Sequence, residues 1–100
     1  MQRQGMESKE FMRTLTLENV QQIMEVCGTD DEYLKKLEEA FVVKIVQRGN
    51  SIVISGGQAD KTESSISDML WAIEHEDGLD KQKVEYIISL NMDGGSYRQL

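Results

Sequence analysis

Three short segments of the chain alternate apolar and polar side chains, which is the pattern of strands with one buried face. They are residues 13–17, 42–47 and 51–55. The last two are joined by Arg48, Gly49 and Asn50, and the Gly-Asn pair suits the two-residue turn of a β-hairpin. By the two-residue period, Lys44 points away from the face that carries Ile45.

Four other segments repeat apolar residues at spacings of three and four, which predicts helices. Their apolar positions are Val20, Ile23, Met24 and Cys27; Leu34, Leu37 and Phe41; Ile66, Met69, Leu70 and Ile73; and Leu79, Val84, Ile87 and Ile88. Asn19 or Thr16 is expected to cap the first helix, and Asp80 the fourth. Thr29 and Glu32 have the spacing of a capping box for the second helix.

The predicted order of elements is β-α-α-β-β-α plus one extra C-terminal helix. This order predicts an α+β domain in which helices cover one face of a three-stranded antiparallel sheet. Residues 1–12 are expected to form a flexible tail, 13–76 the domain, 77–90 the extra helix and 91–100 a tail or linker.

The balance of charges limits the possible partners. The chain has 18 acidic and 11 basic side chains, which gives a formal net charge of −7. Because affinity for phosphate backbones comes largely from lysine and arginine, this total argues against a general polyanion binder, although a local basic patch can act against it. No apolar run is long enough to predict a membrane span, and a single cysteine suits a reducing cytoplasm.

The junction after the first helix carries a recognisable motif. It reads Gly28-x-x-Asp31-x-x-Leu34-Lys35-x-Leu37, and Val43-Lys44-Ile45 follows. This pattern resembles the nucleic-acid-binding KH motif, in which two glycines let a loop clamp the nucleic-acid backbone. Asp31 stands where that motif has its second glycine. The predicted order of elements is also that of a type I KH domain.

A longer series of motifs narrows the resemblance. Arg48-Gly49-Asn50, Ile52-x-Ile54-x-Gly56 and Leu79-Asp80-x-x-x-Val84-x-Tyr86 follow in order. Together, over about residues 14–90, the motifs are similar to the N-terminal KH-like domain of bacterial PhoH-type proteins. In that family the small domain precedes a P-loop ATPase domain related to helicases. This chain has no G-x-x-x-x-G-K-[ST] pattern, so ATP and Mg²⁺ are expected only for an absent ATPase domain and the chain itself is not expected to be an enzyme.

The resemblance implies a nucleic-acid groove between the first two helices and the second strand. Its candidate contacts are Gly28, Thr29, Lys35, Lys44 and Arg48. The carboxylates of Asp30 and Asp31 beside the glycine would repel phosphates. The same residues also have a purely structural interpretation, with the glycine as a helix cap and the cations as solvated surface.

No catalytic or metal-binding residues are predicted. His75 and Cys27 lack partners at the spacings that metal ligands or catalytic groups require. His75 is expected to be an exposed or helix-end residue, and Cys27 a packing residue.

Two functions follow as hypotheses. The first is an accessory domain that makes weak contacts with RNA or single-stranded nucleic acid for the absent ATPase domain in a bacterial cytoplasm. The alternative is a docking module that packs on the ATPase core or on a neighbouring subunit of a homo-oligomer, without binding nucleic acid or a membrane. Its expected contacts are Ile87, on the exposed side of the last helix, and Trp71.

Overall fold

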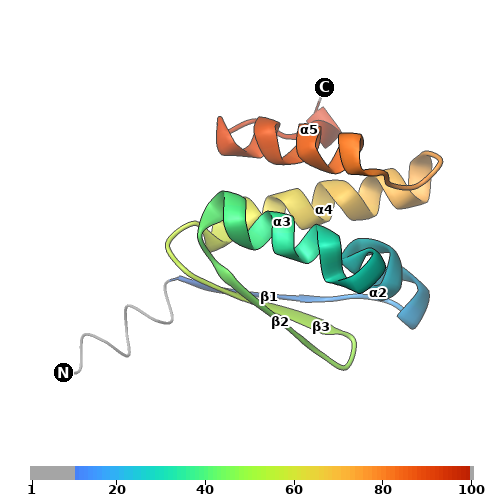
Figure 1. Ribbon diagram of the computed structural model, residues 1–100, viewed down its shortest axis with the longest axis horizontal. Coiled ribbons are helices and arrows are strands. Elements are labelled where there is room, and N and C mark those ends of the chain that lie inside the picture. The colour runs from blue at the N-terminus through green and yellow to red at the C-terminus, as the bar shows by residue number, and fades with distance from the viewer. Residues whose placement is uncertain (1–10, 100) are drawn as a thin grey trace.

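The computed structural model describes residues 11–99, and this part of the chain forms a three-stranded antiparallel sheet with four α-helices (Figure 1). The strands are β1 (Met12–Thr16), β2 (Lys44–Arg48) and β3 (Ser51–Ser55). The α-helices are α2 (Val20–Cys27), α3 (Glu32–Phe41), α4 (Ala59–His75) and α5 (Lys81–Met92), and the short 3₁₀ turns are η1 (Thr29–Asp31) and η2 (Tyr97–Gln99). The predicted α+β class and antiparallel sheet are confirmed. Most of the predicted N-terminal tail lies outside the described residues, and Met12 belongs to β1.

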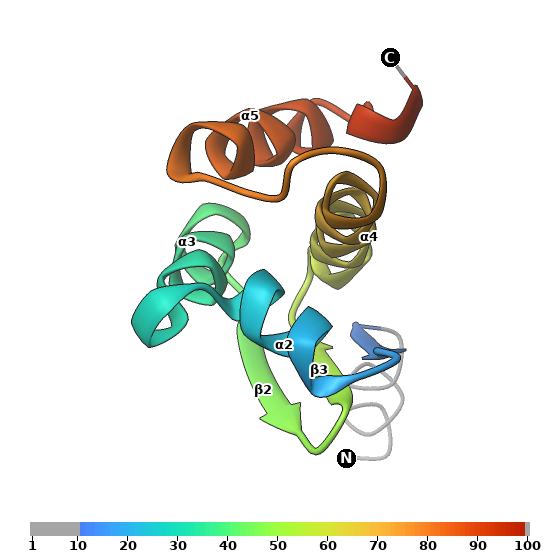
Figure 2. The same ribbon diagram turned by 90° about the vertical axis from the view of Figure 1, so that its right-hand side faces the viewer.

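The sheet has the order β1-β3-β2, so β2 is an edge strand. Arg48 lies opposite Ser51, which confirms the two-residue turn at Gly49 and Asn50. Ile45 lies opposite Ile54, and both belong to the face that carries the core. Figure 2 shows the helices on one side of the sheet, and none of the elements in residues 11–99 covers the opposite, open face.

The core forms between the inner face of the sheet and the helices. Ile52 and Ile54 of the central strand are fully buried in one cluster with Leu37, Phe41 and Ile66. Helix α5 packs against α4 and α3 and lies on the side of these helices away from the sheet (Figure 1). The domain therefore has three layers, which are the sheet, the helices packed on it, and α5 on the far side of α3 and α4.

The side of α2 that is buried differs from the predicted one. Of the two expected caps, Asn19 and not Thr16 caps the helix, because its side chain accepts a hydrogen bond from the Gln22 backbone nitrogen. However, Val20 and Met24 are 63% and 64% exposed. Val26, outside the predicted stripe, is buried instead. The pattern correctly predicted a helix but not which neighbours it would meet.

The predicted capping box at the start of α3 is wrong. Thr29 begins the η1 turn, and Asp31 directly precedes α3 in a left-handed conformation (φ 59°) without a side-chain cap hydrogen bond. The chain between α2 and α3 therefore turns through unusual backbone angles and not through a side-chain cap.

Helix α3 ends at a residue poorly suited to its conformation. Val42 has φ 54° and ψ 54°, its backbone nitrogen donates to Glu38 O, and its side chain is 80% exposed. This left-handed position after a helix is usually glycine, because a β-branched side chain is strained there. Val42 therefore carries local strain with little compensating burial.

We expect the Val42→Gly variant to be about 1 kcal/mol more stable than the parent chain. A left-handed conformation costs an L-residue roughly 1–2 kcal/mol, and the extra unfolded-state entropy of glycine offsets only part of the relief. Urea unfolding followed by circular dichroism measures the difference.

Val42→Ala is the matched control, because alanine keeps the unfavourable positive φ while losing the same exposed side chain. Its free energy of unfolding should be close to that of the parent chain. Destabilisation by Val42→Gly would contradict the strain at this position.

Helix α5 begins at the predicted cap, but its packing differs from the prediction at Ile87. Asp80 caps it as predicted, since its carboxylate accepts from the Lys83 backbone nitrogen at 2.7 Å. Ile87, however, is 0% exposed and belongs to the core. The prediction that Ile87 lies on an exposed contact surface is therefore wrong, because this side of α5 faces the other helices. The large apolar residues exposed on α5 are Tyr86 and Met92.

The segment from Asn91 differs from the predicted loose tail. Helix α5 continues to Met92, and the following chain folds back onto the fully buried Asp68 of α4. The carboxylate of Asp68 accepts hydrogen bonds from the Asn91 and Ser96 side chains at 2.8 and 2.9 Å, and from the Tyr97 backbone nitrogen at 2.9 Å. It also forms an ion pair with Arg98. We call this set of contacts the C-terminal anchor.

Candidate nucleic-acid interface

Two of the predicted cationic contacts lie on β2. Lys44 and Arg48 are paired with Ser55 and Ser51 of β3, four positions apart on the same strand. They share a face, as predicted, but it is the open face of the sheet, because Ile45 between them faces the core. Both side chains are exposed, so they lie along the free edge of the sheet and not beneath the helices.

The third cation approaches the same edge from the helical layer. Lys35 is exposed on α3, one turn before Glu38. The Glu38 carboxylate accepts a hydrogen bond from the Ile45 backbone nitrogen at 2.8 Å, which shows that this flank of α3 faces β2. Because residues three apart share a helix flank, Lys35 lies on the β2 side of α3. Lys35, Lys44 and Arg48 therefore flank the free edge of β2 from both sides, and we call them the edge cations.

Within residues 11–99, the edge cations differ from most other basic residues because no described side chain or backbone group pairs with them. Among residues 11–99, no hydrogen bond or ion pair joins the side chains of the edge cations to another residue. By contrast, Arg13, Lys36, Lys83 and Arg98 form ion pairs with acidic side chains. The edge cations can therefore contact an external anion without breaking an internal ion pair.

The loop between α2 and α3 has a backbone that depends on glycine. Gly28 has φ 77°, and Asp30 and Asp31 also have positive φ values of 54° and 59°. A Cβ atom at position 28 would lie 2.7 Å from the Tyr33 ring, too close for any side chain. Both the conformation and the packing against Tyr33 require glycine here, so the structural interpretation accounts for Gly28 without a ligand.

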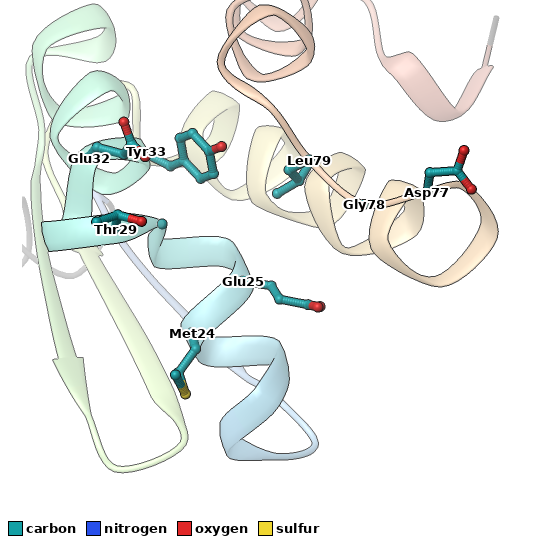
Figure 3. Close-up of a pocket in the computed structure, with 9 residues that line it drawn as sticks. Met24, Glu25, Thr29, Glu32, Tyr33, Asp77, Gly78 and Leu79 are labelled. Atoms are coloured by element: carbon teal, nitrogen blue, oxygen red, sulfur yellow. The ribbon is translucent and has the colours of Figure 1, made fainter.

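Gly28 and Thr29 line an open hollow that is acidic (Figure 3). The hollow has a volume of about 410 Å³ and lies between the end of α2, the start of α3 and the loop before α5. It is lined by Met24, Glu25, Gly28, Thr29, Glu32, Tyr33, Asp77, Gly78 and Leu79. The lining includes three carboxylates and no lysine or arginine, so this side of the loop repels phosphates.

The negative field of the hollow also affects Tyr33. The pKa of its phenol is raised, first by partial desolvation and then by the carboxylates of Glu32 and Asp80. The two sides of α3 therefore differ: the edge cations lie toward β2, and carboxylates surround the hollow.

The exposed apolar side of α2 was not predicted. Val20 and Met24 are one turn apart, and their exposure shows that this flank of α2 does not face the core. A different flank of α2 faces α4, because the Gln22 side chain donates a hydrogen bond to Glu74. Their helical spacing suggested burial, and no signal in the sequence separates these two residues from the buried members of the same stripe.

The remaining candidate residues have structural environments. Burial, and then the nearby Asp31 carboxylate, raise the pKa of the Cys27 thiol, which disfavours the reactive thiolate. His75 is exposed at the end of α4, as predicted, and its ring stacks on Trp71 at 4.7 Å. Trp71 also meets the edge of Tyr97 at 6.1 Å, so the half-buried indole lies within a row of aromatic rings.

No group of acidic, histidine and cysteine side chains in the described part of the chain could hold a metal ion. Across residues 11–99, no helix combines the length and apolar character needed to cross a bilayer. Comparison of the chain with protein-family models, curated proteins and solved structures gave no match.

Proposed function

We propose that this chain is a KH-like accessory domain of a PhoH-type ATPase and makes weak contacts with RNA or single-stranded nucleic acid along the free edge of β2. The observation that carries the proposal is the set of three exposed edge cations that have no partner among the described residues. An extended polyanion lying along this edge would meet positive charge from the sheet and from α3.

The arrangement of the elements supports the KH-like part of the proposal. The chain runs from β1 through two helices to a β-hairpin and then to α4, and the last strand of the three is central. The loop between the first two helices begins with Gly28 at positive φ. The extra helix α5 covers α3 and α4 from the side opposite the sheet, so it leaves the edge of β2 accessible.

The exposed side chains of α2 add an apolar surface to this region. Figure 3 shows the Met24 side chain projecting from the surface of α2, and the hydrogen bond from the Leu17 backbone nitrogen to Asn50 O joins the segment before α2 to the hairpin turn. Proteins that bind single strands generally combine a cationic groove with aromatic side chains on which bases stack, and aliphatic side chains can supply only a weaker apolar contact. We assign this role to Val20 and Met24. The net charge of −7 and the acidic loop keep the expected affinity low and strongly dependent on salt.

We expect Lys44→Glu and Arg48→Glu each to weaken binding of single-stranded RNA by about tenfold at low salt and to reduce the salt slope by about one per lost phosphate contact. Fluorescence anisotropy with a labelled RNA, repeated at several salt concentrations, measures both quantities. The parent chain should bind at low salt and release the RNA as the salt concentration rises.

Lys81→Glu is the matched control, because Lys81 is exposed at the start of α5 and the substitution changes the net charge equally. It should reduce the affinity for RNA much less. Equal weakening by all three variants would show that only the net charge of the chain matters. Absence of RNA binding by the parent chain at low salt would overturn the proposal.

The acidic loop supplies a second arm of the same experiment. Asp31→Asn removes a charge while tolerating the left-handed conformation, and Asp31→Gly also frees the backbone for close approach. Both variants should bind RNA more tightly than the parent chain, with the glycine variant tightest. Unchanged affinity in both would place the loop outside the interface.

A second candidate function is docking onto the ATPase core or a neighbouring subunit. The observation that favours it is the exposure of Tyr86 and Met92 on α5, which takes the place of the contact expected at Ile87. In that case Tyr86→Asp would weaken assembly with the ATPase domain and leave RNA binding unchanged.

A further inference from the structure

The hollow beside the α2–α3 loop shares Met24, at its rim, with the surface proposed for the nucleic-acid contact. It lies between the end of α2, the start of α3 and the loop before α5, and its apolar surface comes from Met24, Tyr33 and Leu79 (Figure 3). Tyr33 and Leu79 are half-buried, whereas Met24 is 64% exposed at the rim. Part of the hollow is therefore fixed by packing, and part can adapt to a ligand.

The position of the Tyr33 ring is set by the backbone. The absence of a side chain at Gly28 lets the ring lie against the loop, where a Cβ atom would come within 2.7 Å of it. The ring lines the hollow next to Glu32, which follows Thr29 and the loop, while Glu25 and Asp77 lie at other parts of the rim (Figure 3). An aromatic face next to carboxylates is an arrangement that recognises organic cations, because the ring attracts the cation and the carboxylates accept its hydrogen bonds.

We propose that this hollow is a docking site for an arginine-bearing segment of a partner protein. Arginine fits best because its planar guanidinium can stack on a ring and donate to two carboxylates at once. The thioether of Met24 and the side chain of Leu79 can pack against its methylene stem or against a neighbouring apolar residue of the partner.

The charge and shape of the surface favour a basic protein segment over other occupants. The nine lining residues include three acidic and no basic ones, so a nucleic acid is repelled. The hollow is open, and the exposed Val20 and Met24 extend its apolar surface along α2, which suits an extended or helical segment more than an enclosed small molecule. This proposal does not depend on the nucleic-acid contact at β2.

The test uses the full chain and a short fluorescein-labelled, alanine-based peptide that carries two arginines and two leucines. Anisotropy should show saturable binding, whereas a peptide with glutamates in place of the arginines should not bind. The double variant Glu32→Gln/Asp77→Asn should weaken binding at least about fivefold, because two exposed charge contacts are lost. Tyr33→Leu, which keeps an apolar side chain but removes the ring, should weaken binding a few-fold.

The matched control is Glu39→Gln/Asp93→Asn, which removes two exposed carboxylates that do not line the hollow. It should change the affinity less than about twofold. Equal weakening by the two double variants would show that only net charge matters and would overturn the proposal. So would binding of the glutamate peptide, or absence of binding by the parent chain. Circular dichroism of each variant checks that the fold is retained.

Discussion

Replacing Asp68 with alanine is expected to lower the free energy of unfolding by about 3–5 kcal/mol, because it removes the acceptor at the centre of the C-terminal anchor. Asp68 is 0% exposed, and its carboxylate accepts hydrogen bonds from the Asn91 amide, the Ser96 hydroxyl and two backbone nitrogens. Without it, these donors remain buried without partners, and each such group costs roughly 1–3 kcal/mol. Since a domain of this size has a total stability of about 5–15 kcal/mol, the loss is large.

Two measurements test the role of Asp68. Urea unfolding gives the change in stability, and the fluorescence of Trp71, the single tryptophan, reports on release of the η2 turn that carries Tyr97. Asp68→Ala should shift the emission to longer wavelength as the indole gains solvent. Asp68→Asn should also destabilise the chain, because its amide group presents hydrogens to neighbouring donors.

The control for this prediction is Asp60→Ala on the same helix. Asp60 is exposed in the first turn of α4, where a carboxylate contributes only about 0.3–1 kcal/mol through the helix dipole. A loss in Asp68→Ala no greater than that of the control, with unchanged tryptophan emission, would show that the C-terminal anchor is not stabilising.

Ile87→Asp is expected to prevent stable folding, with a cost of about 4 kcal/mol or more. Ile87 is fully buried in the core cluster, so an ionised aspartate there would be desolvated without a cation to pair with it. Thermal unfolding by circular dichroism should show either no cooperative transition or a midpoint far below that of the parent chain.

Tyr86→Asp provides the comparison from the adjacent position of α5. Tyr86 is 48% exposed, and its loss removes mainly an edge contact with the Tyr97 ring, so we expect a cost of about 1 kcal/mol. A cooperative transition near the parent midpoint in Ile87→Asp would contradict the packing of α5 on α3 and α4. Tests of assembly through α5 therefore need Tyr86 or Met92 and not Ile87.

The three edge cations were singled out from sequence as candidate contacts, but their arrangement in space was not predicted. The two-residue period correctly placed Lys44 and Arg48 on one face of a strand. The two-residue period could not show that this face of the sheet is open. It also could not show that the Glu38 carboxylate on α3 accepts a hydrogen bond from the Ile45 backbone nitrogen at the free edge of β2. The hollow was missed entirely, because Asp77 and Leu79 are about fifty residues from Met24 and Glu25 in the chain and no local pattern joins them.

The sequence by itself determined the α+β class, the strands and α-helices found in residues 11–99, the hairpin turn and the cap at Asp80, and it narrowed the first cap to Asn19 or Thr16. These features depend on interactions between residues a few positions apart, which periodicity and turn preferences record. The tertiary structure decided which flank of α2 is exposed, that Ile87 is buried, and that the C-terminal segment is held by Asp68. Each of these outcomes depends on how distant elements pack, and the same amphipathic pattern is compatible with several packing partners until the chain is folded.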